Sequence, residues 1–429
     1  MESLRMQFYR LVTKIYKDVD YPNIPIPIYA MFYVIASQYL KNVKISFGGE
    51  KKSLRLSYFW VGGSRTGKGQ LMKIAQTSAE KLGLKCAIVT DITDAGLLGS
   101  IDEKAIDYNN KNKLKEGDKD YKCPVIYGDL FNYDIIIFRE CKKLLIPTNT
   151  TEMLLSILQE ALDEPGYLRK KLKSQYPIEG ESTISLVATT YFMNEIEKTL
   201  VDQGFFMRVP LYVRDLSIDE VQELREGVID MYGKKNVIDK KKIEKDIQSF
   251  VDNFKKVKQD DKILTLDDSA IERLKDINKQ FFVLMRQTTG HKLNILKSLS
   301  QLIIDISVKI GGIHACLDNV DVINKNHINP AFIFIKACTD TILNKIELIE
   351  STISVKSKTI NNAILNFRLC LKEKNTDRIC KEDFCNFLKS KGLGRNKALN
   401  IINKLISDNY IKVDKGEKNT KNLIINNGY

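Results

Sequence analysis

A stretch of apolar residues runs directly into a glycine-rich turn and then into a helical pattern. Residues 54–62, LRLSYFWVG, are rich in β-branched and aromatic side chains and predict a buried strand. The turn GGSRTGKGQ follows at residues 62–70, and residues 70–84 have the spacing of a helix. Such a junction brings backbone N–H groups and a lysine together at a helix N-terminus, which favours a bound phosphate.

The turn matches the first seven positions of the phosphate-binding pattern G-x-x-x-x-G-K-[ST]. The eighth position holds Gly69, so the hydroxyl that normally contacts Mg²⁺ is missing. We predict ATP and Mg²⁺ as cofactors; the alternative is a glycine-rich turn that binds no nucleotide. The residues predicted to bind the nucleotide are Gly62, Gly63, Ser64, Arg65, Thr66, Gly67, Lys68, Gly69 and Gln70.

Further apolar segments alternate with helical ones. Those with the composition of strands are CAIVTDIT (86–93), YDIIIFRE (133–140), TISLVATT (183–190) and MRVPLYV (207–213). This alternation predicts an α/β fold, in which helices cover both faces of a parallel sheet. Residues 216–350 have helical patterns and predict an all-helical lid, which starts at a capping box formed by Ser217 and Glu220.

The strand predicted at residues 133–140 ends in Arg139-Glu140, where a phosphate-loop ATPase usually has Asp-Glu. Glu140 stands where a catalytic carboxylate would polarise the attacking water; the alternative is a surface residue at the end of a strand. Arg139 replaces the aspartate on the metal side. Together with Gly69, this predicts either that Mg²⁺ is held mainly by phosphates and water, or that hydrolysis is weak.

Charge and length point to several domains and an anionic partner. The chain has 429 residues, enough for two to four domains, and a net charge of +13. Residues 351–429 contain 16 Lys and Arg against 7 Asp and Glu, a net +9, which leaves +4 for the rest. This excess favours nucleic acid as a partner. A composition of 43% apolar and 28% charged residues excludes a disordered polyelectrolyte.

Metal, export and membrane signals are weak. Eight cysteines without a C-x-x-C pair and three scattered histidines do not supply the clustered ligands of structural zinc. The N-terminal segment lacks the apolar core of an export signal, and the longest apolar stretches fall short of the ~20 residues of a membrane span. We expect a soluble, cytoplasmic protein with no membrane partner.

The motifs together resemble the MCM-like branch of the AAA+ ATPases over roughly residues 50–215. The matching segments are GSRTGKGQLMK (63–73), DAGLLGSI (94–101), VIYGDLFNYDIIIFRECKKLL (125–145), LLSILQEALDE (154–164), LVATT (186–190) and GFFMRVPLYV (204–213). The chain departs from the family at Gly69, at Arg139 and in having no N-terminal DNA-binding collar. It resembles the shorter helicases of plasmids, phages, viruses and other mobile elements.

The resemblance implies a homo-oligomeric ring, a hexamer, with ATP at each subunit interface. Lys68 and Glu140 would act within one subunit, Thr190 would be the sensor 1 residue, and Arg208 would reach the neighbour's γ-phosphate. The alternative for Arg208 is an ordinary arginine at the edge of a strand. A sensor 2 residue would come from the lid, with Arg286, Lys292 and Lys297 as candidates.

Rings of this family carry two hairpins that face the channel, and residues 102–123 and 166–183 occupy their positions. We expect an exposed hairpin or loop in the first. The second carries the predicted DNA-contacting cluster Arg169, Lys170, Lys171 and Lys173. Its charge suits sequence-independent phosphate contacts; the alternative is a solvated loop.

The C-terminal residues resemble a winged helix. Helical patterns cover residues 360–371, 381–391 and 395–407, and two alternating segments, 410–414 and 422–426, predict a hairpin. A winged helix places the start of its third helix in the DNA major groove; the alternative is a protein-interaction lid. The predicted DNA-contacting residues are Arg395, Lys397, Asn400, Lys404, Lys415, Lys418 and Lys421.

We therefore expect an N-terminal helical segment (1–50), an AAA+ ATPase core (51–215), a helical lid (216–350) and a winged-helix domain (358–429). The leading hypothesis is an ATP-driven replicative DNA helicase that translocates on single-stranded DNA, engages forked DNA, and works with a primase or polymerase of the same element. The alternatives are an initiator or helicase loader that uses ATP as a switch, a structural ring that binds ATP without turnover, and a viral superfamily 3 helicase.

Overall fold

The computed structural model divides the chain into two compact units, Met1–Ile349 and Glu350–Tyr429. The residues that it describes are 3–18, 24–62, 66–90, 93–141, 149–164, 166–170, 178–190, 208–214, 218–233, 240–288, 290–350, 355–374, 376, 378–390, 394–407, 410–415 and 421–425.

A five-stranded parallel sheet lies at the centre of the first unit, in the spatial order β11-β3-β10-β7-β4. Its strands are β3 (Tyr58–Gly62), β4 (Cys86–Val89), β7 (Ile135–Phe138), β10 (Ser185–Thr190) and β11 (Leu211–Arg214). Every residue of β3, β7 and β10 is buried, as expected for strands covered on both faces. The predicted α/β fold, a parallel sheet flanked by helices, is confirmed.

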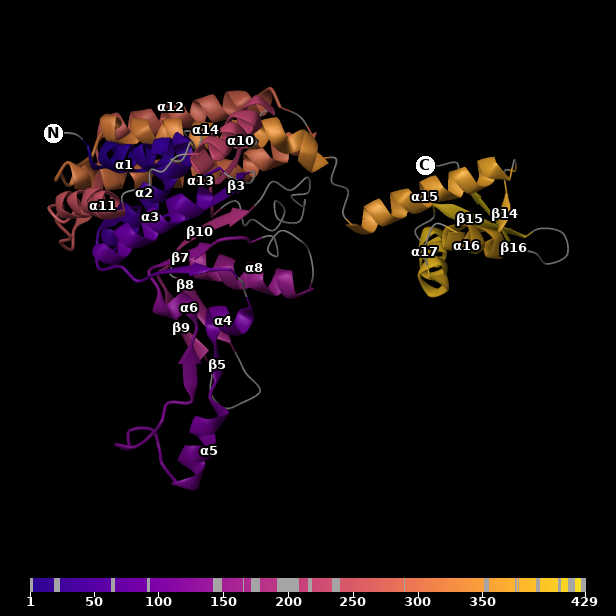
Figure 1. Cartoon of the computed structure of the whole chain (residues 1–429), viewed down its shortest axis with the longest axis horizontal. Helices are drawn as coiled ribbons and strands as arrows, with labels where there is room; N and C mark the ends of the chain where they lie inside the picture. The colour runs from indigo at the N-terminus through magenta and orange to yellow at the C-terminus, as the bar shows by residue number, and fades with distance from the viewer. Residues whose placement is uncertain are drawn as a thin grey trace. The chain divides into compact units, whose positions relative to one another are not determined.

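Helices pack on both faces of this sheet (Figure 1). α2 (Pro25–Tyr39) contacts β3, β7 and β10 and also α3 (Lys68–Lys81), which joins β3 to β4. α8 (Asn149–Leu162) joins β7 to β10 on the side away from α3. The two crossovers run in opposite directions across the sheet, so right-handed connections place their helices on opposite faces.

The first 50 residues are built into the first unit. α1 (Leu4–Asp18) packs against α2 and α11 (Lys240–Phe254). β1 (Lys44–Phe47) pairs in parallel with β12 (Ile263–Leu266), within a four-stranded sheet of order β13-β12-β1-β2. The remaining elements are β2 (Glu50–Ser53), α10 (Ile218–Gly233), α12 (Asp268–Arg286), α13 (Gly290–Leu317), β13 (Val322–Ile323) and α14 (Lys325–Glu350).

The prediction of an all-helical lid is wrong at β12 and β13. Both strands are too short to display an alternating pattern of their own. β12 is extended because its backbone pairs with β1, more than two hundred residues earlier in the chain, and β13 continues the same sheet. Tertiary pairing of this kind decides the conformation of short apolar segments.

An arm extends from the parallel sheet, with α5 at its far end (Figure 1). Its elements are α4 (Asp94–Leu98), β5 (Gly99–Ile101), α5 (Glu103–Lys111), β6 (Val125–Tyr127), α6 (Asp129–Asn132), β8 (Gly166–Lys170) and β9 (Ile178–Ser182). Residues 102–123, expected to be a hairpin or loop, instead begin with helix α5, which the Asp102 carboxylate caps by accepting from the N–H of Lys104 (3.0 Å). β8 and β9 form an antiparallel hairpin, as predicted.

The second unit has its own apolar core. It contains α15 (Val355–Glu373), β14 (Ile379–Cys380), α16 (Lys381–Ser390), α17 (Arg395–Ser407), β15 (Ile411–Lys415) and β16 (Lys421–Ile425). The strands form an antiparallel sheet of order β14-β16-β15. The rings of Phe367 and Phe384 pack edge to face, with centroids 4.8 Å apart. The helices and the hairpin match the prediction, and β14 is an addition to it.

Among the residues that the structure describes, no helix has both the length and the apolar character needed to cross a membrane.

Candidate nucleotide site

The described part of the junction between β3 and α3 places a glycine at the N-terminus of a helix. α3 begins at Lys68, directly after Gly67, which has a left-handed backbone (φ +78°). A Cβ at Gly67 would also lie 2.6 Å from the ring of Tyr16, so only glycine fits here. The predicted residues Gly63, Ser64 and Arg65 lie outside the described residues. The N-terminus of α3 therefore follows the end of β3, and the positive end of the helix dipole favours an anion there.

Lys68 folds back over this junction. Its ammonium group donates to the carbonyl of Thr190 (3.1 Å) and to the carbonyl of Gly62. Burial lowers the pKa of Lys68 to about 8, although the nearby carboxylate of Glu140 and the thiol of Cys141 act in the opposite direction. Lys68 is thus partly desolvated and lies beside two of the residues predicted for the same site.

The strand order brings the other catalytic candidates to this edge. β10, which ends at Thr190, lies between β3 and β7, and Arg139-Glu140 follows β7. The carboxyl ends of parallel strands share one edge of a sheet, where ligands bind in open α/β folds. The side chain of Thr190 is buried, whereas those of Arg139 and Glu140 are exposed. Lys68, Thr190 and Glu140 are therefore neighbours, although they are far apart in the sequence.

Hydrogen bonds hold the segment after β7 in place. The N–H of Arg139 donates to the carbonyl of Val89 (2.9 Å), and its carbonyl accepts from the hydroxyl of Thr189 (2.8 Å). The N–H of Cys141 donates to the carbonyl of Thr189 (3.0 Å). The backbone on both sides of Glu140 is consequently fixed to the neighbouring strands β4 and β10.

Gly69 and Arg139, the two residues that differ from the usual ATPase pattern, lie close together. One terminal nitrogen of Arg139 lies 3.8 Å from the position that a Cβ of Gly69 would take. Gly69 and Gln70 belong to the first turn of α3 and are half-buried. No group of three or more metal-ligating side chains occurs among the described residues. The residues present fit the phosphates of a nucleotide, but the two positions that normally serve Mg²⁺ offer no oxygen ligand.

Arg208 lies elsewhere. It precedes β11, whose first residues pair with the beginning of β3, so it belongs to the opposite edge of the sheet. Its guanidinium donates one hydrogen bond to each carboxylate oxygen of Asp163, from Nε (2.5 Å) and from a terminal nitrogen (2.9 Å). Arg55 fixes the same segment by donating to the carbonyls of Leu162 (3.0 Å) and Asp163 (2.5 Å). Within the chain, the structure does not bring Arg208 to Lys68.

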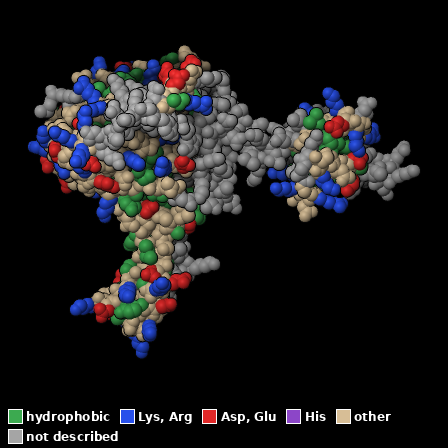
Figure 2. All heavy atoms as spheres, viewed as in Figure 1, with side chains coloured by type: hydrophobic (Ala, Val, Ile, Leu, Met, Phe, Trp, Pro, Cys, Tyr) green, Lys and Arg blue, Asp and Glu red, His purple; other side chains and the backbone are tan. Residues whose placement is uncertain are grey.

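The predicted DNA-contacting residues of the first unit fall on the β8–β9 hairpin. Arg169 is exposed on β8 and pairs with Glu179 of β9 (3.1 Å). Lys170 is the last residue of β8, while Lys171 and Lys173 lie outside the described residues. Figure 2 shows acidic as well as basic side chains over the arm, so its visible face is mixed in charge.

In the second unit, α17 has one buried and one exposed face. Ala398, Ile402 and Leu405 are buried in the core of the unit. The predicted contacts exposed on the other face are Arg395, Lys397, Asn400 and Lys404. Lys415 ends β15 and Lys421 begins β16, whereas Lys418 lies outside the described residues.

Of the sensor 2 candidates, Arg286 ends α12 and Lys297 lies on α13, and both are exposed. Lys292 also belongs to α13, but its side chain lies outside the described residues. Nothing in these positions favours one candidate over the others.

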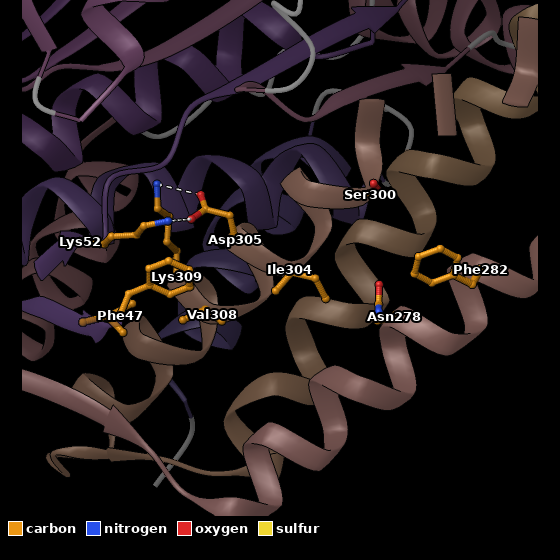
Figure 3. Close-up of a pocket in the computed structure, with 10 residues that line it drawn as sticks. Phe47, Lys52, Asn278, Phe282, Ser300, Ile304, Asp305, Val308 and Lys309 are labelled. Atoms are coloured by element: carbon orange, nitrogen blue, oxygen red, sulfur yellow. Dashed lines mark ion pairs between the residues drawn. The ribbon is translucent and has the colours of Figure 1, made fainter. Parts of the chain in front are cut away.

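Two cavities lie away from this edge. The first, about 370 Å³, opens between Phe47 of β1, Phe282 of α12 and Ile304 of α13, beside the ion pair of Lys309 with Asp305 (3.0 Å; Figure 3). The second, about 740 Å³, is lined by residues that precede β3 and β10, such as Arg55 and Thr183. Neither is lined by a described residue of the phosphate-binding turn.

Two aromatic residues of the site, Tyr16 and Trp60, could not be identified as site residues from the sequence. Tyr16 of α1 donates to the carbonyl of Gly67 (3.0 Å). Trp60 of β3 is buried, and its ring lies 5.9 Å from the ammonium group of Lys68. A tyrosine in an amphipathic helix and a tryptophan in a buried strand both look like core residues, so only the packing identifies them.

Comparisons with protein families and with curated proteins found no match for this chain.

Proposed function

We propose that this protein is an ATP-driven motor of the MCM-like AAA+ type, a ring-forming DNA helicase of a mobile or viral element. The observation that carries the proposal is the meeting of Lys68, Thr190 and Glu140 at the carboxyl edge of one parallel sheet. A lysine at a helix N-terminus, a polar residue on the strand beside it and an exposed carboxylate just after the next strand are three of the parts that phosphoryl transfer to water uses.

Each residue has a role that follows from its position. The N–H groups at the start of α3 and the ammonium group of Lys68 would hold phosphate oxygens. Glu140 would orient and accept a proton from the attacking water, because its carboxylate is exposed and its backbone is fixed between β4 and β10. When bound, ATP supplies the phosphoanhydride bond whose cleavage drives the motor.

Arg208 supports a ring, because it lies at the edge of the sheet opposite Lys68. An arginine at this distance from the phosphate site of its own subunit is suited to contact the phosphates of a neighbour. Its partner Asp163 is about half exposed, so solvent screens the ion pair, which is worth at most about 1 kcal/mol. The finger role and the hexamer remain part of the proposal.

The proposed DNA contacts are the β8–β9 hairpin, through Arg169 and the basic residues beyond it, and the exposed face of α17. We propose that the second unit is a winged helix; its three helices and three-stranded sheet support this assignment. The hairpin would follow single-stranded DNA in the channel, and the winged helix would capture forked DNA. A primase or polymerase of the same element would be a further partner.

A second candidate function has one observation in its favour. Arg139 and Gly69 leave the site without the usual oxygen ligands for Mg²⁺, which suits slow turnover. An initiator or helicase loader that uses ATP binding as a switch would tolerate slow hydrolysis, whereas a processive motor would not.

The test is DNA-stimulated ATP hydrolysis together with strand displacement on a forked duplex. We expect single-stranded DNA to stimulate hydrolysis, Lys68→Ala to abolish ATP binding, and Glu140→Gln to bind ATP while losing about 10²- to 10⁴-fold in turnover. ATP-dependent assembly on DNA without unwinding would favour the loader. Equal turnover in the wild type and in Glu140→Gln would overturn the motor.

A further inference from the structure

The strongest unexplained feature of the site is a cation where a metal ligand is expected. The guanidinium of Arg139 is exposed, and one of its nitrogens lies 3.8 Å from the Cβ position of Gly69. In a phosphate-loop ATPase, these two positions normally carry an aspartate and a hydroxyl that hold Mg²⁺ on the phosphates. Here one position offers a positive charge and the other offers no side chain.

Mg²⁺ does not fit this pair of residues. Its preferred ligands are oxygens in octahedral array, and it is repelled by a fixed positive charge nearby. Glu140 is the adjacent carboxylate, but it is already placed to act on water. Among the described residues, a magnesium ion at this point would have no oxygen ligand from position 69 of α3 and would meet a guanidinium after β7.

We propose that the guanidinium of Arg139 takes the place of Mg²⁺ on the nucleotide, so that the site binds ATP without a divalent cation. The inference rests on the proposed nucleotide site and assigns a specificity-determining residue within it. The ligand is then the free, tetra-anionic form of the nucleotide rather than its magnesium complex.

Arginine is well suited to this role. Its planar fork donates two parallel N–H bonds to phosphate oxygens and stays charged at every physiological pH. Gly69 contributes no side chain of its own between α3 and the guanidinium, whose nearest nitrogen lies 3.8 Å from its Cβ position. The departures at 69 and 139 act on one place: position 69 offers no oxygen to a metal, and position 139 brings a guanidinium close to it.

The arginine is also available for a ligand. Its backbone is fixed by hydrogen bonds with Val89 and Thr189. Its side chain forms no ion pair with a carboxylate of any described residue, Glu140 included. A guanidinium that no carboxylate among the described residues neutralises adds to the positive field that Lys68 and the N-terminus of α3 create.

The full chain can report on this directly, because Trp60 is its single tryptophan and lies close to Lys68. ATP is titrated at constant ionic strength, once with excess EDTA and once with Mg²⁺, and Trp60 fluorescence gives Kd. Equilibrium dialysis with radiolabelled ATP repeats the measurement without relying on a fluorescence change. The variants are Arg139→Gln and Arg139→Lys, and Arg225→Gln, an exposed arginine of α10, is the matched control.

We expect the wild type to bind ATP in EDTA with a Kd within about threefold of that in Mg²⁺. Arg139→Gln should weaken binding in EDTA by about 10- to 100-fold, the usual worth of a charge-assisted hydrogen bond to phosphate. Arg139→Lys should lie in between, since it keeps the charge and loses the fork. Arg225→Gln should bind as the wild type does.

A double variant tests whether restoring the usual Mg²⁺ ligands makes ATP binding depend on Mg²⁺. Gly69→Ser together with Arg139→Asp restores both oxygen ligands, and it should convert the site to one that binds ATP at least tenfold more tightly with Mg²⁺ than with EDTA. Circular dichroism of each variant confirms that folding is intact.

The outcomes separate the two proposals. A wild type that binds ATP only with Mg²⁺, with Arg139→Gln indistinguishable from it, overturns the role of Arg139 and leaves the nucleotide site standing. A wild type that binds ATP under neither condition, or a Lys68→Ala variant that binds as tightly as the wild type, overturns both.

Discussion

The hydroxyl of Tyr16 donates a hydrogen bond to the carbonyl of Gly67, 3.0 Å away, and so links the first helix of the chain to the candidate phosphate-binding turn. The same ring closes the space beside the α-carbon of Gly67. The backbone at Gly67 is therefore held by a residue of α1, which makes this helix part of the candidate site.

Removing this hydroxyl should loosen the turn. We expect Tyr16→Phe, which keeps the ring, to lower the free energy of unfolding by about 1 kcal/mol and to weaken ATP binding severalfold in a fluorescence titration. Tyr29→Phe is the matched control, because the Tyr29 hydroxyl contacts the sulfur of Met6 instead (3.8 Å). If both variants bind ATP equally well, the Tyr16 hydroxyl does not position the turn.

Arg208 and Asp163 provide a test that separates catalysis from structure. We expect Arg208→Ala to lose at least about 10³-fold in ATP turnover, the usual contribution of an arginine finger, while binding ATP as the wild type does. Asp163→Asn breaks the same ion pair but keeps the arginine, so it should retain turnover. Equal losses in the two variants would mean that Arg208 acts only through its bond to Asp163.

The sequence predicts the parts of the site that are encoded locally. β3, the glycine turn and α3 follow one another along the chain, so apolar runs, glycines and a lysine are enough to identify them. The strand before Glu140 is recognisable as a run of apolar residues, and the strand that ends at Thr190 contains the apolar residues Leu186, Val187 and Ala188. The alternation of strands and helices implies a parallel sheet, and in a parallel sheet the carboxyl ends of all strands lie at the same edge. Glu140 and Thr190 are therefore expected at that edge.

The parts that the sequence does not reveal depend on contacts between distant segments. Tyr16 reaches Gly67 only because α1 packs on α2 and α11, and β12 is a strand only because it pairs with β1. The departures at Gly69 and Arg139 are visible in the sequence, but their closeness depends on the strand order. No local pattern encodes such distances.

The buried histidine of α13 should make folding sensitive to acid. The ring of His314 lies 3.1 Å from the hydroxyl of Tyr33, and burial, with smaller contributions from Arg5 and His327, lowers the pKa of His314 to about 3. The folded state thus favours the neutral ring, so its stabilising effect is complete above the unfolded pKa of about 6.5 and is lost as the pH falls towards 3.

Between pH 6.5 and 5, we expect this histidine to lower the free energy of unfolding by about 1–2 kcal/mol. Urea denaturation of the wild type and of His314→Gln over this range measures the effect. The variant should show a flatter dependence on pH, because its amide has no proton to gain. Parallel curves for the two proteins would assign the acid sensitivity to other groups.

The lysine of the site should make nucleotide binding sensitive to alkali. Burial, which outweighs the opposing effect of Glu140, lowers the pKa of Lys68 to about 8, and only the protonated ammonium attracts phosphate. Raising the pH from 7 to 9 removes this charge from most molecules, so the Kd for ATP should rise about tenfold. Lys68→Arg is the control: a guanidinium stays charged over this range, so its Kd should hardly change. If the wild type were as insensitive as Lys68→Arg, Lys68 would not contact the phosphates in its protonated form.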